Sequence, residues 1–80
     1  MKMSEFINVD DAIIVGEQLV DVLVRAAKKE GIPDALRDAV NTRYPGFVRE
    51  ALYMPQHERA AAIGKMRRHI RLLREQEKRG

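Results

Sequence analysis

The fold of this chain is decided by residues 9–30, which read VDDAIIVGEQLVDVLVRAAKKE. On a helical wheel the apolar side chains of this stretch gather on one side and cover about half of the circumference. That apolar face comprises Val9, Ala12, Ile13, Val15, Gly16, Leu19, Val20, Val22, Leu23, Ala26 and Ala27. Acidic residues stand early in the stretch and basic residues late, as the dipole of a helix favours. The pattern predicts one long amphipathic helix, with Asn8 as its N-cap and Gly31 as its C-cap.

A pair of β-strands is the alternative for this stretch, because β-branched side chains suit a pleated sheet. The β-branched residues are Ile13, Ile14, Val15, Val20, Val22 and Val24. Their spacing follows the period of a helix better than the strict alternation of a strand, so the helix is the preferred interpretation.

Three prolines, Pro33, Pro45 and Pro55, divide the rest of the chain, and each can open a new helix while ending the previous one. Short helices are expected over 33–43 and 46–53. Each should bury one small stripe; the two stripes are Ala35, Leu36, Ala39 and Val40, and Phe47, Val48, Ala51 and Leu52.

A long helix is expected from Pro55 to about residue 78, with the seam spacing of a packed or coiled helix. The seam consists of Ile63, Met66, Ile70 and Leu73. The predicted fold class is therefore all-α: a small bundle of three to four helices with a long first helix and a long basic C-terminal helix. Residues 1–80 should form a single helical domain, flexible at 1–8 and at about 76–80.

Composition excludes several classes of protein. Eighty residues with no cysteine cannot hold a disulfide framework or a thiolate metal cluster, and the small core leaves the monomer marginal or in need of a partner. Glu17, Asp21 and Arg25 interrupt the most apolar stretch, so a membrane span is not expected. The first residues lack the pattern of a secretory signal, and the expected location is the cytoplasm.

The residues that could act as nucleophiles, acid–base catalysts or metal ligands do not indicate an enzyme. His57-Glu58 begins like a zinc-protease motif, but Ala61 stands where the second histidine is needed. We therefore expect no catalysis, no cofactor and no bound metal. A helix-turn-helix DNA-binding motif is also disfavoured, because Arg49 is the sole basic residue of the expected helix over 46–53, which would be the recognition helix.

Positive charge is concentrated in the last helix. Residues 1–63 hold eight basic and ten acidic side chains, whereas residues 64–80 hold seven basic and two acidic ones. Four bases at helical spacing form a strip about 16 Å long: Arg67, Arg71, Arg74 and Lys78. The strip is either an ordinary solvated face or, as an alternative function, the nucleic-acid-binding surface of an accessory domain.

Apolar residues placed away from the expected core suggest docking on another protein. Ile14 stands at the centre of the polar side of the first helix and Val24 at its margin, while Leu72 is displaced from the seam of the last helix. Tyr53 and Met54 occupy a helix junction, where an amphipathic ring and a flexible thioether suit adaptable contacts. A homodimer through two copies of the 63–73 seam is a further expectation.

Several short sequence segments within residues 8–49 resemble segments of the theta subunit of bacterial DNA polymerase III and its phage homologue. They are Asn8-Val9-Asp10, Ile32-Pro33, Asp38-Ala39-Val40, Pro45 and Arg49, in that order. The resemblance implies a small, helical, non-enzymatic subunit that binds a proofreading exonuclease through a hydrophobic helix surface. The sequence as a whole thus predicts a protein-binding module: an adaptor, an accessory subunit or a phage- or plasmid-type inhibitor of a larger host protein.

Overall fold

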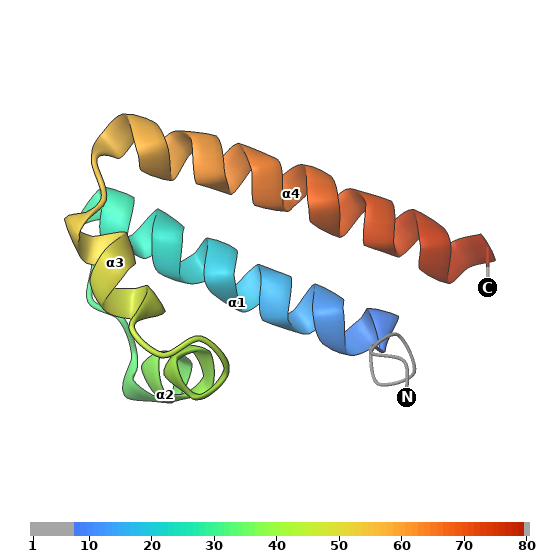
Figure 1. Cartoon of the computed structure of the whole chain (residues 1–80), viewed down its shortest axis with the longest axis horizontal. Coiled ribbons are helices and arrows are strands. Elements are labelled where there is room, and N and C mark those ends of the chain that lie inside the picture. The colour runs from blue at the N-terminus through green and yellow to red at the C-terminus, as the bar shows by residue number, and fades with distance from the viewer. Residues whose placement is uncertain (1–7, 80) are drawn as a thin grey trace.

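The computed structural model describes residues 8–79, with side chains for residues 8–78. Within this range all regular structure is helical: α1 (Val9–Lys28), α2 (Asp34–Arg43), α3 (Phe47–Tyr53) and α4 (Gln56–Arg79). The helices α1 and α4 lie side by side and antiparallel, and α2 and α3 pack near the C-terminal end of α1 (Figure 1). The predicted all-α bundle is confirmed. Residues 1–7 lie outside the described residues, and α4 is helical through Arg79, so the predicted flexibility of both ends stays a prediction.

The start of α1 is as predicted, and its end is not. The Asn8 side-chain oxygen accepts hydrogen bonds from the backbone N–H groups of Asp10 (2.8 Å) and Asp11 (3.4 Å), which is an N-cap. The predicted C-cap at Gly31 is wrong, because the helix ends at Lys28 and Lys29 takes the left-handed conformation with φ 60°. The early end lets the chain turn back and bury Ile32 against α1.

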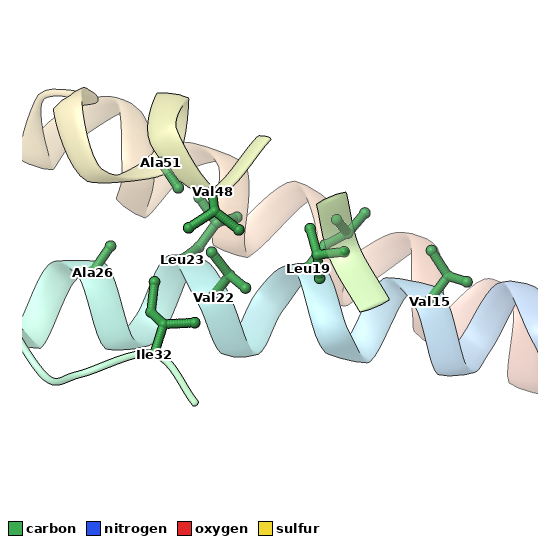
Figure 2. Packing of buried hydrophobic residues seen from close by; sticks show 9 residues of the cluster. Val15, Leu19, Val22, Leu23, Ala26, Ile32, Val48 and Ala51 are labelled. Atoms are coloured by element: carbon green, nitrogen blue, oxygen red, sulfur yellow. The ribbon is translucent and has the colours of Figure 1, made fainter. Parts of the chain in front are cut away.

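The core lies where α1, α2 and α3 meet. Its buried members are Val15, Leu19, Val22, Leu23, Ala26, Ile32, Val40, Val48 and Ala51, and Figure 2 shows those of α1 spaced along the helix from Val15 to Ala26. Ile63 and Met66 of α4 pack against this cluster from the other side. Ile63, Met66 and Ile70 of the predicted seam are therefore in contact with the rest of the same chain, and the homodimer stays a prediction.

Two predicted core residues are exposed. Leu52 and Ala35 were expected in the buried stripes of their helices, but both face solvent. Because α2 and α3 are short and each packs mainly through one or two side chains, Val40 for α2 and Val48 with Ala51 for α3, the outer edge of each stripe stays uncovered.

The connections between helices are fixed by local bonds that the sequence analysis did not anticipate. Gly46, with φ 85°, follows Pro45 in a turn closed by a bond from the Phe47 N–H to the Tyr44 carbonyl (3.0 Å). A proline followed by a residue with positive φ is the pattern of a type II turn, which favours glycine at that place. At the next junction Arg59 donates to the carbonyls of Ala51 (2.7 Å) and Leu52 (2.9 Å), satisfying the free end of α3.

Candidate functional site

Ile14 projects from the outward face of α1, and 54% of its surface is exposed. It separates two shallow hollows. One, of about 610 Å³, lies between α1 and the end of α4; the other, of about 470 Å³, lies between α1 and α2. The predicted exposure of Ile14 is confirmed, and a large apolar side chain at this place is available for contact with another molecule.

The other candidates for protein binding lie elsewhere. Val24 is half-buried and lines a hollow of about 370 Å³ with Arg67 and Ile70 of α4. Leu72 is 58% exposed and lines a separate hollow on α4. The five predicted residues thus do not form one patch.

At the α3–α4 junction the two predicted residues behave differently. Tyr53 is 80% exposed at the last position of α3. Met54 is half-buried and packs against the core, because the chain runs extended at this residue (φ −65°, ψ 138°) and turns its side chain inward. Met54 therefore supports the junction, and of the two predicted residues Tyr53 is the exposed one.

The basic strip of α4 runs along an acidic edge of α1. Arg74 forms an ion pair with Glu17 (Nη2–Oε2 2.5 Å). Arg67 lines the same hollow as Glu17 and Asp21. The antiparallel packing of the helices brings the early acids of α1 against the late bases of α4. Part of the charge that could attract phosphates is consequently balanced within the chain.

The remaining two bases of the strip differ in their surroundings. Lys78 lines a hollow together with Asp10 and Glu77, two carboxylates that offset its charge. Arg71 is exposed and forms no ion pair with any side chain of residues 8–78. The four bases of the strip are thus unequal, and Arg71 is the most available to an external anion.

The described residues contain neither a metal-binding cluster nor a membrane-spanning helix. Among the described residues, no three His, Asp or Glu side chains come together in a way that could hold a metal ion. None of the four described helices combines the length and the apolar character needed to cross a bilayer.

Comparisons with family models, with curated proteins and with solved structures found no match in any of the three. The resemblance to the theta subunit consequently stays a prediction from residues 8–49.

Proposed function

We propose that this chain is a small, non-catalytic, cytoplasmic protein-binding module that docks on a larger partner protein. The roles that fit are an adaptor, an accessory subunit or a phage- or plasmid-type inhibitor. The observation that carries the proposal is the exposure of Ile14 in the middle of the longest amphipathic helix. A partner that covered this side chain would add apolar burial that a core of this small size lacks.

The theta-like role is the most specific form of this proposal. In that form the partner is a proofreading exonuclease, and a helix surface of this chain stabilises it. This form is supported by the order of the short theta-like segments within residues 8–49 and by the long amphipathic helix that begins with the first of them.

Replacing Ile14 by aspartate is expected to reduce partner capture at least tenfold, because an apolar anchor at the centre of an interface is replaced by a charge. The measurement is recovery of the captured protein from a bacterial lysate on the immobilised variant, followed by its identification. Helicity and the midpoint of urea unfolding should stay close to those of the parent, since Ile14 is exposed.

The matched control for this experiment is Leu52→Asp, which replaces another exposed large apolar side chain, on α3 and away from the hollows beside Ile14, by the same charge. The proposal fails if no protein is captured specifically by the parent, or if Ile14→Asp captures as much as Leu52→Asp does. Purified proofreading exonuclease, tested for complex formation by gel filtration, separates the theta-like form from the general one.

Nucleic-acid binding through Arg67, Arg71, Arg74 and Lys78 remains the second candidate, and the acidic edge of α1 weighs against it. Four freely available bases would give a log–log dependence of duplex affinity on salt with a slope of roughly −3 to −4. We expect a shallower slope and weak binding, because Arg74 is paired with Glu17.

Fluorescence anisotropy with duplex and single-stranded DNA at two salt concentrations measures this slope. A steep slope with micromolar affinity, lost in an Arg71→Glu variant, would establish the nucleic-acid function in place of the protein-binding one.

A further inference from the structure

The exposed side chain of Ile14 has mainly acidic neighbours on its own helix. Residues three and four positions apart are neighbours on the surface of a helix. Around Ile14 these positions hold Asp10, Asp11, Glu17 and Gln18. Three of the four neighbours are carboxylates and none is a base, so a large apolar side chain stands in a negatively charged part of α1.

Two further carboxylates reach this surface from other helices. Glu77 of α4 lines the hollow on one side of Ile14, and Asp38 of α2 lines the hollow on the other side. Both residues are exposed, and neither forms an ion pair with another side chain of residues 8–78. We call Ile14 and the carboxylates around it the Ile14 face. Its carboxylates are those of Asp10, Asp11, Glu17, Asp38 and Glu77.

The bases that reach the Ile14 face do not cancel its negative charge. Arg43 is bound to Asp11 at 3.0 Å, and Arg74 is bound to Glu17. Lys78 is the third base that lines the two hollows. Three bases against five carboxylates leave two negative charges in excess, whereas the whole chain carries a net charge of +3. The Ile14 face is therefore an acidic region of a basic protein.

The shape and the charge of the Ile14 face together restrict its occupant. Ile14 projects between two shallow hollows, so the complementary surface is a pocket that receives one branched side chain. Burial of this side chain is favourable when the pocket is apolar. The carboxylates around it lose water on binding, and cationic side chains at the rim of the pocket would offset that cost. Nucleic acid does not fit, because the carboxylates repel phosphates.

We propose that the Ile14 face docks into an apolar pocket of the partner protein whose rim is formed by lysine and arginine side chains. This inference rests on the proposed protein-binding function and adds to it the chemistry of the partner's surface. Complementary charges across an interface favour recognition and raise the rate of encounter. Salt screens such charges, so binding through this face should weaken as the ionic strength rises.

The test uses the protein that the parent chain captures from a bacterial lysate and that Ile14→Asp does not capture. This protein is purified and titrated against two charge-reversed variants of the full chain, Asp38→Lys and Glu75→Lys. The second variant is the control, because Glu75 lines neither hollow beside Ile14. Asp38→Lys should raise the dissociation constant about tenfold, since like charges would face each other across the interface. Glu75→Lys should leave it unchanged.

Two further measurements separate a charge effect from a loss of folding or of fit. Both variants should keep the helicity and the urea midpoint of the parent, because Asp38 and Glu75 are exposed and form no ion pair with any side chain of residues 8–78. Raising the ionic strength should weaken binding of the parent and narrow the difference between the parent and Asp38→Lys, because salt screens the charges involved.

Three results would overturn the proposal. The first is an equal dissociation constant for Asp38→Lys and Glu75→Lys, and the second is binding of the parent that does not respond to salt. In both cases capture still depends on Ile14, so this inference fails while the proposed function stands. The third is self-association of the purified parent in sedimentation equilibrium that Ile14→Asp abolishes, which would assign the face to a second copy. If the parent captures no protein through Ile14, the proposed function and this inference fail together.

Discussion

Leu23→Ala is expected to lower the free energy of unfolding by about 2–5 kcal/mol, the range for truncating a leucine in a packed core. Leu23 is 1% exposed and lies beside Val22 and Val48 at the centre of the cluster in Figure 2. A domain of this length has a total stability of only about 4–12 kcal/mol at the usual value per residue. The variant should therefore lose a large part of its stability, measured by urea unfolding with far-UV circular dichroism.

The same substitution at Leu52 is the matched control. Leu52 is 45% exposed on α3, and Leu52→Ala should change the free energy of unfolding by no more than about 0.5 kcal/mol. Similar losses in the two variants would show that the core is not where α1, α2 and α3 meet.

The second large effect is expected at Gly16, where α1 and α4 approach closely. A Cβ atom placed on Gly16 would stand 3.0 Å from Ile70 Cγ1, too near for an unshifted contact. In Gly16→Leu the larger side chain must push α4 away, at a cost of about 1–3 kcal/mol or more for overpacking. The gain of about 1 kcal/mol in helix propensity offsets only part of this cost. Thermal unfolding should show a clearly lower midpoint.

Gly64 provides a control of opposite sign. A Cβ atom there meets Arg68 Nη1 at 3.6 Å, an ordinary contact with the end of a flexible side chain. Gly64→Ala should therefore raise stability by up to about 1 kcal/mol through helix propensity.

A double variant tests the steric explanation for Gly16. Adding Ile70→Ala to Gly16→Leu should recover part of the stability lost in Gly16→Leu, because it frees the space that the leucine needs. If the double variant is no better than the sum of its two parts, the steric explanation is wrong.

Most of the fold could be predicted from the sequence, because the signals are local. The apolar period of residues 9–30 and the three prolines gave four helices, and the structure places them within a few residues of the expected bounds. The wrong predictions concern single residues. Gly31 is a good C-cap by residue type, yet Lys29 ends α1, and the chain turns there so that Ile32 is buried in the core. Leu52 fits a buried stripe, but no neighbouring element covers it.

The candidate surfaces were less predictable. The exposure of Ile14 and Leu72 followed from their places on single helices and is confirmed, and Tyr53, chosen for its place at a helix junction, is exposed as well. The half-buried position of Met54 depends on how α3 turns into α4, and the pairing of Arg74 with Glu17 joins residues 57 positions apart. A helical wheel treats each helix alone and contains no information on such pairs.

Periodicity, prolines and capping act over a few residues, so the all-α class, the long amphipathic first helix and its N-cap at Asn8 could be predicted without knowing the packing. The antiparallel packing of α4 on α1, the approach of Gly16 to Ile70 and the pairing of Arg74 with Glu17 are known from the tertiary structure alone. The physical reason is that packing and charge pairing depend on which helices become neighbours, and that choice is made by the burial of the whole apolar surface at once.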